Sequence, residues 1–121
     1  MRLLILPVAL ILSGLLIGAS PQSQDRTIAL VFTTGPGWDA SKAPNAQAQF
    51  GSHSNNLRRL RVAGVIVAGG RFAQYGLILV RAPGVDSARA MLVPDSSIVV
   101  GTFKVEVSPW STIYEGTITR P

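Results

Sequence analysis

His53 is the side chain of this 121-residue sequence best suited to moving protons near neutral pH, because it is the only histidine. It lies in a segment where Phe50, His53, Leu57 and Leu60 recur at the spacing of one helix face. An unpartnered imidazole on an apolar face is unfavourable, so we expect His53 to meet a hydrogen-bond partner or a cavity. The segment therefore offers a general acid or base. The alternative is a satisfied core histidine that takes no part in chemistry.

The other residue types exclude several kinds of site. The chain has no cysteine, so it has no disulfide, no thiolate metal ligand and no cysteine nucleophile. One imidazole with six scattered carboxylates gives little support for a metal site. No Gly-x-Ser-x-Gly motif is present, and the Gly69-Gly70 pair is not followed by the residues of a phosphate-binding loop. We therefore expect neither a metal nor a cofactor.

Aromatic residues near the ends of predicted strands could line an apolar pocket beside His53. These residues are Trp38, Phe72, Tyr75 and Trp110. Packing in the core or at a dimer interface is the alternative explanation for each of them. Arg71, next to the glycine pair, could bind an anionic group of a substrate or form an ion pair with Asp95.

The composition is that of one small folded domain. Hydrophobic residues make up 47 % of the chain and charged residues only 14 %, which excludes an intrinsically disordered protein. The formal net charge is +5. The only cluster of basic residues is Arg58, Arg59 and Arg61, which we interpret as a solvated helix surface. No nucleic-acid-binding motif accompanies them, so we expect no nucleic-acid partner.

The first 23 residues have the layout of a secretory signal peptide. Arg2 precedes an uncharged apolar run at 3–17, and small and polar residues follow at 18–24. A membrane anchor is the alternative, but a spanning helix needs about 20 apolar residues. We therefore expect an exported protein, periplasmic or secreted, whose domain covers residues 24–121 and which has no membrane association after cleavage.

Hydrophobic periodicity and turn residues divide this domain into six elements. They are a strand at 27–33, a helix at 45–63, strands at 65–68 and 76–81, a short helix capped by Asp86 and ended before Pro94, and a strand at 101–108. Gly64 is expected to end the first helix, and Gly69-Gly70 the second strand. The tail at 110–121 alternates weakly around Ile113 and Ile118 and could add a fifth strand.

The order strand, helix, strand, strand, helix, strand predicts a ferredoxin-like α+β fold, with a four-stranded antiparallel sheet and two helices on one face. The first and third predicted strands are apolar on both sides, as Leu30 and Val31 illustrate. The helices can cover only one face of the sheet, and an exposed apolar face usually marks an interface. We therefore expect a homodimer packed sheet to sheet about a two-fold axis. The last strand alternates apolar residues with Lys104 and Glu106, which predicts a position nearer an edge.

Between Thr27 and Trp110 the sequence carries a series of short motifs. They are, in order, Gly35-Pro36-Gly37-Trp38, His53 with Leu57 and Leu60, Gly64, Ala68-Gly69-Gly70-Arg71-Phe72, Asp95, Gly101, Phe103-Lys104-Val105-Glu106-Val107 and Pro109-Trp110. Taken together, these motifs resemble the YciI-like (YCII-related) family of small proteins. The chain departs from that family in having Asp95-Ser96 in place of the usual Asp-Pro, and in having an export signal where most members are cytoplasmic.

The resemblance implies a dimeric α/β-barrel arrangement and an active site built on His53 and Asp95. It also implies lyase-like or hydrolase-like chemistry on a small organic molecule. A carboxylate that accepts from one ring nitrogen would fix the tautomer and leave the other nitrogen free to move a proton. Two alternatives stay open. The Asp95-Ser96-Ser97 segment could be an ordinary Asx turn, and the protein could be a non-catalytic ligand-binding or structural dimer.

Overall fold

The structure is a computed structural model that describes residue 14 and residues 24–121. The expected signal peptide, residues 1–23, lies outside the described residues, apart from residue 14. Within the described part of the chain, no helix has the length and apolar character needed to cross a bilayer.

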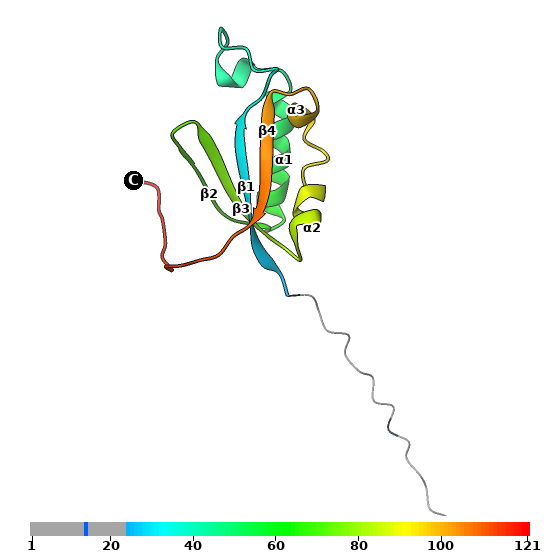
Figure 1. Cartoon of the computed structure of the whole chain (residues 1–121), viewed down its shortest axis with the longest axis vertical. Helices are drawn as coiled ribbons and strands as arrows, with labels where there is room; N and C mark the ends of the chain where they lie inside the picture. The colour runs from blue at the N-terminus through cyan, green and yellow to red at the C-terminus, as the bar shows by residue number, and fades with distance from the viewer. Residues whose placement is uncertain (1–13, 15–23) are drawn as a thin grey trace, which may run out of the picture.

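A four-stranded antiparallel sheet forms the centre of the domain (Figure 1). Its strands are β1 (Arg26–Thr34), β2 (Ile66–Phe72), β3 (Tyr75–Ala82) and β4 (Phe103–Pro109). They are arranged in the order β2-β3-β1-β4, so that β1 is central and β4 is an edge strand, as predicted. This arrangement is compatible with a ferredoxin-like fold.

The helices lie on one face of this sheet (Figure 1). They are α1 (Phe50–Val62), α2 (Val85–Ala90) and α3 (Ser96–Val99), preceded by a 3-10 turn, η1 (Pro44–Ala46). The core forms between the two layers, where Ile28, Leu30 and Phe32 of β1 pack with Val80 of β3 and with Leu92. Residues two apart share one face of a strand, so Ile28, Leu30 and Phe32 all point from β1 into this core.

The predicted helix at 45–63 is wrong in its first part, because η1 and a loop precede α1. Gln49 has a left-handed backbone conformation, with φ 58°, which interrupts the helix immediately before Phe50. The buried side chain of Gln47 accepts from the backbone of Asp39 and donates to the carbonyl oxygens of Asp39 and Lys42. These bonds give the loop a fixed irregular shape. The predicted end of the helix is confirmed, since Gly64 has φ 73°.

The hairpin of β2 and β3 is longer than predicted. Gly69 and Gly70 lie inside β2 and do not end it, and the turn consists of Ala73 and Gln74. Gly69 is crowded on one side, because an added Cβ would lie 2.7 Å from the end of the Ile78 side chain. An added Cβ at Gly70 would meet open space. Crowding therefore accounts for only one of the two glycines.

The second half of the chain differs from prediction at three points. Gly84, and not Asp86, occupies the position before α2, and Asp86 lies in its first turn. The helix α3 was not predicted, and Asp95 caps it by accepting from the Ser97 N–H. The tail at 110–121 contains no strand, so its weak alternation does not lead to pairing.

No helix or strand among the described residues covers the face of the sheet away from the helices. Ala29 and Val31 of β1 point to this face and lie opposite Leu79 and Leu77 of β3. Val31 and both leucines are only partly buried. The sheet therefore leaves an apolar surface open, as the two-sided pattern of β1 and β3 predicts.

Candidate functional site

The predicted contact between His53 and Asp95 is present. The His53 Nδ1 atom lies 2.7 Å from Asp95 Oδ2, although the two residues are 42 positions apart in the sequence. The His53 side chain is 12 % exposed and the Asp95 side chain is fully buried. Helix α1 supplies the imidazole, and the segment between α2 and α3 supplies the carboxylate.

Ser97 holds the other oxygen of the same carboxylate. Asp95 Oδ1 accepts from the Ser97 backbone N–H at 3.0 Å and from the Ser97 hydroxyl. Burial alone would raise the pKa of Asp95, but the hydrogen bonds from His53 and Ser97 outweigh burial and hold this pKa below its usual value. Asp95 is therefore ionised at neutral pH and is both an Asx-type cap and the partner of His53.

An ionised carboxylate can only accept hydrogen bonds, so the proton between the two groups must be on His53 Nδ1. This assigns the Nδ1–H tautomer to the neutral ring and leaves Nε2 as the basic nitrogen. No hydrogen bond to Nε2 is found in the described residues. In the same part of the chain no buried side-chain nitrogen or oxygen lacks a partner, so Nε2 reaches solvent.

Aromatic rings surround the imidazole. The Phe103 ring lies 4.5 Å from it at 36°, and the buried Phe32 ring meets it edge-on, at 5.0 Å and 75°. Phe50, one turn earlier on α1, lies at 6.3 Å, and Trp38 lies 5.7 Å from Phe103. The site is therefore a hydrogen-bonded pair of imidazole and carboxylate with apolar walls, where electrostatic interactions are stronger than in water.

Close contact between two backbone segments places these aromatic residues. The Gly35 and Gly37 N–H groups donate to the carbonyl oxygens of Thr102 and Gly101, at 2.9 and 2.8 Å. A Cβ at Gly35 would lie 2.1 Å from the Gly101 oxygen, so the approach requires glycine. The contact fixes the loop that carries Trp38 beside the start of β4. The buried Thr102 hydroxyl also donates to the Ala48 oxygen, at 2.6 Å, just before α1.

The other predicted pocket residues do not lie beside His53 in the single chain. Phe72 and Tyr75 form a pair, 5.1 Å apart, on the sheet face opposite the helices. Trp110 donates from its backbone to Thr27, at the end of β1 remote from Phe32. Arg71 is exposed, and among the described residues it has no ion pair and no side-chain hydrogen bond. A role for these four residues in substrate binding stays a prediction.

Two serines hold Asp95, and sequence reasoning missed one of them. The Asx turn considered for Asp95-Ser96-Ser97 is present, because Asp95 accepts from the Ser97 N–H, whereas the role of Ser52 was not predicted. Ser52 binds the backbone on both sides of Asp95, at Pro94 and Ser96. The sequence indicates the position of Ser52 only weakly, because Ser52, Asn56 and Arg59 recur at helical spacing beside the apolar stripe.

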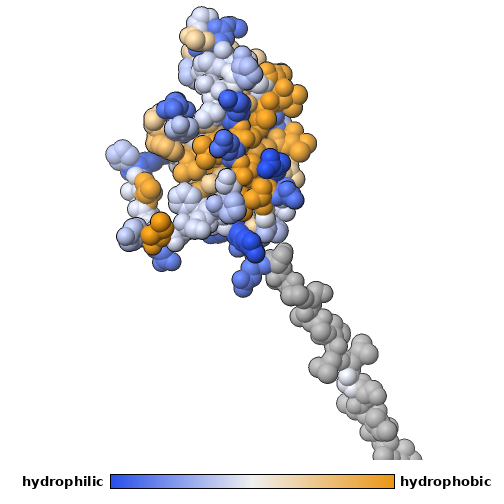
Figure 2. Space-filling view, viewed as in Figure 1, coloured by the Kyte–Doolittle hydropathy of each residue, from blue (hydrophilic) through white to orange (hydrophobic). Residues whose placement is uncertain are grey.

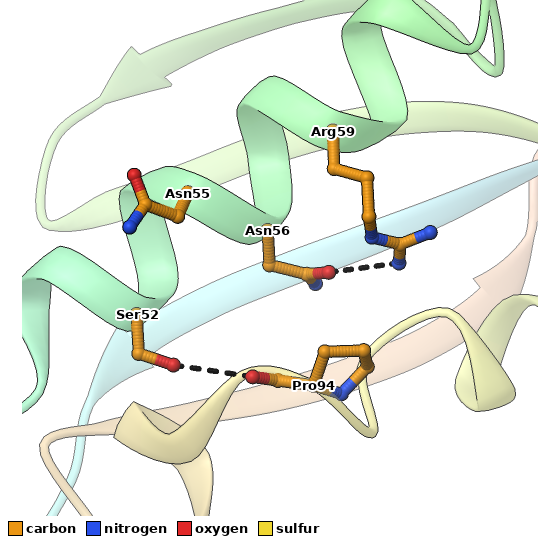
Figure 3. A pocket seen from close by; sticks show the side chains of 5 residues that line it. All are labelled: Ser52, Asn55, Asn56, Arg59 and Pro94. Atoms are coloured by element: carbon orange, nitrogen blue, oxygen red, sulfur yellow. Dashed lines mark hydrogen bonds between the residues drawn. The ribbon is translucent and has the colours of Figure 1, made fainter.

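Two surface hollows adjoin the pair, and the His53 ring lines neither of them. The first is polar and lies between α1 and the segment before α3 (Figure 3). Its lining consists of Ser52, Asn55, Asn56, Arg59 and Pro94. The second is an apolar groove between α2, α3 and β4, with Leu92, Ile98 and Val105 in its walls and Arg89 and Lys104 among its lining residues. Figure 2 shows hydrophobic residues gathered over this side of the molecule.

The described residues contain no group of three or more potential metal ligands. Comparison of the chain with family models, with curated proteins and with solved structures finds no match. The resemblance to the YciI-like family therefore stays a prediction.

Proposed function

We propose that this protein is a small enzyme that performs acid/base chemistry on a small organic molecule without a cofactor. His53 is the acid/base and Asp95 is its orienting partner. The observation that carries the proposal is the 2.7 Å contact from Nδ1 to a buried carboxylate, on a ring whose Nε2 has no partner in the described residues. This is the arrangement that general base catalysis requires.

In this proposal Nε2 takes a proton from a substrate carbon or from a water molecule, and later returns it to a leaving group. The first case is an elimination and the second a hydrolysis. Asp95 stabilises the imidazolium that forms in either case, because its charge lies against the protonated ring. The rings of Phe50, Phe103 and Trp38 favour a substrate with an apolar part next to the reacting atom.

Turnover measurements on a panel of small apolar esters, lactones and β-substituted carbonyl compounds test the proposal. Acid release reports hydrolysis, and the absorbance of a new conjugated double bond reports elimination. We expect His53→Gln to lower kcat by at least about 100-fold on any compound that is turned over, which is the usual contribution of a general base. Equal rates for the wild type and His53→Gln on every compound would contradict the proposal.

A non-catalytic ligand-binding module is the second candidate, and the apolar groove beside β4 is the observation that favours it. This groove has a volume of about 820 Å³ and borders Asp95 and Phe103 without containing the His53 ring. A ligand held there would raise the melting temperature. Thermal shifts without turnover, unchanged in His53→Gln, would favour binding over catalysis.

We also propose that the active form is an exported homodimer packed sheet to sheet. The uncovered face with Val31, Leu77 and Leu79 supports the dimer, because burial of these side chains is favourable. The charge and hydropathy pattern of residues 1–23 supports export. A mass measurement on the protein recovered from the cell exterior or periplasm tests cleavage near residue 24.

A further inference from the structure

We propose that Ser52 is a positioning residue of the site, which fixes the backbone of Asp95 relative to the helix that carries His53. This inference rests on the proposed function of the His53–Asp95 pair. The hydrogen bonds of Ser52 go to the backbone and not to the imidazole or the carboxylate, so Ser52 acts through the segment that presents the carboxylate.

The hydroxyl of Ser52 binds both peptide groups that flank Asp95. It donates to the Pro94 carbonyl oxygen at 3.1 Å (Figure 3) and accepts from the Ser96 N–H at 2.9 Å. The Pro94 oxygen belongs to the peptide bond before Asp95, and the Ser96 N–H to the peptide bond after it. The planes of these two peptides define φ and ψ of Asp95, which are −85° and 93°. One side chain therefore holds the extended conformation from which the carboxylate reaches the ring.

Ser52 and His53 are consecutive residues of α1, so one turn of helix holds both the backbone and the side chain of the same aspartate. The other side-chain hydrogen bonds from α1 to this segment are more distant. Asn56 and Arg59 donate to the Met91 carbonyl oxygen, at 3.0 and 3.4 Å, four residues before Asp95. Ser97 holds the carboxylate but belongs to the same segment, so it cannot set the distance to α1.

The Ser96 N–H is also a donor that would otherwise be unpaired. It is the first N–H of α3, and the first turn of a helix has no internal partners for its N–H groups. Ser97 uses the Asp95 carboxylate as its acceptor. Without the Ser52 hydroxyl, the Ser96 N–H would compete for the same carboxylate, and that competition would turn the carboxylate away from His53.

Nitrogen-15 NMR of the single histidine in the tag-free protein tests this inference. The readouts are the exchange rate of the Nδ1 proton with solvent and the fraction of the neutral ring in the Nδ1–H tautomer. We expect Ser52→Ala to speed the exchange of the Nδ1 proton about tenfold, because a tenfold change corresponds to the free energy of about one hydrogen bond. We also expect it to lower the fraction of the neutral ring in the Nδ1–H tautomer. Ser52→Thr, which keeps the hydroxyl, is expected to restore the wild-type rate within about twofold. Ser52→Cys keeps the size with weaker hydrogen bonds and is expected to fall between the two.

The matched control is Asn56→Ala, which removes the neighbouring tie to the same segment. It is expected to lower stability while leaving the Nδ1 exchange rate within about twofold of wild type. If the Nδ1 proton exchanged at the wild-type rate in both Ser52→Ala and Ser52→Cys, the positioning role of Ser52 would be overturned. The same conclusion would follow if Asn56→Ala sped the exchange as much as Ser52→Ala. The absence of a protected Nδ1 proton in the wild type would instead contradict the His53–Asp95 pair itself.

Discussion

Asp95 is the residue on which the site depends most, because both of its oxygens have partners in a buried position. Oδ2 meets His53, and Oδ1 meets the backbone and hydroxyl of Ser97. A buried carboxylate is tolerated only when such partners offset the loss of hydration. The same bonds lower its pKa, so the acidity of Asp95 is linked to the stability of the fold.

Asp95→Asn is expected to lower the free energy of unfolding by about 2 kcal/mol at pH 6, the usual value of hydrogen bonds to a charged group. Because the folded pKa lies below the unfolded value of about 3.9, the contribution of the ionised form is complete above that value. It is lost as the pH falls through the lower folded pKa. Denaturant titrations of both proteins from pH 7 to pH 2 should therefore converge at the acid end.

Asp86→Asn is the control for this experiment, since Asp86 is exposed in the first turn of α2. Its effect should stay within about 0.5 kcal/mol. If the difference in the free energy of unfolding between the wild type and Asp95→Asn were the same at every pH in this range, ionisation of Asp95 would not be linked to stability.

The sequence predicted the contact between His53 and Asp95 and allowed for an Asx turn with Ser97, but it did not predict the hydrogen bonds of Ser52. His53 was predictable because it is the only imidazole and lies on an apolar helix stripe, and Asp95 followed from a resemblance. The bonds of Ser52 to Pro94 and Ser96 depend on how a helix meets a loop 42 to 44 residues away. No local pattern in one sequence encodes that contact.

The loop after β1 and the turn before β4 position two of the aromatic residues of the site, Trp38 and Phe103. Gly35 and Gly37 allow two backbones to approach within hydrogen-bond distance, and Gly101 turns the chain with φ 78°. Trp38 and Phe103 follow directly after these segments. The glycines therefore help to shape the site by placing Trp38 and Phe103.

Gly35→Ala is expected to lower the free energy of unfolding by about 2 kcal/mol, because the new Cβ would meet a backbone oxygen that has no room to move. Thermal and urea unfolding measure this loss. The control is Gly51→Ala in α1, where an added Cβ meets nothing within 4 Å and helix propensity favours alanine by about 1 kcal/mol. Similar stability of the two variants would show that the Gly35–Gly101 contact is not tight.

The presence and the order of the strands were predictable from alternation and turns, whereas the end of β2 and the start of α1 were not. The strand β1 and the edge position of β4 follow from period-two patterns. The start of α1 was missed because Gln47 and Gln49 have no strong helix-breaking signal in the sequence. Their side-chain bonds and left-handed backbone become visible only in the folded loop.

The two faces of the sheet differ in whether helices cover them. One face is closed by α1, α2 and α3, and the other leaves Val31, Leu77 and Leu79 partly exposed. The tail at 110–121 adds further exposed apolar side chains. Such a surface favours self-association in a soluble protein.

Leu79→Glu is expected to convert the proposed dimer into a monomer, raising the dissociation constant at least about 100-fold because a charge would be buried against apolar side chains. Sedimentation equilibrium over a range of concentrations measures this change. Val99→Glu, at an exposed position on α3, is the control and should leave the dimer intact. A wild-type protein that stays monomeric at every concentration would contradict the proposed dimer.

Asp95 holds the imidazole of His53 in the Nδ1–H form and leaves Nε2 without a protein partner among the described residues. Nitrogen-15 NMR of the single histidine measures this tautomer. At a pH where the ring is neutral, we expect a protonated Nδ1, an unprotonated Nε2 and a slowly exchanging Nδ1 proton. In Asp95→Asn that protection should be lost. A neutral ring protonated at Nε2 in the wild type, or one whose Nδ1 proton exchanges as fast as in free imidazole, would show that Asp95 does not hold the ring.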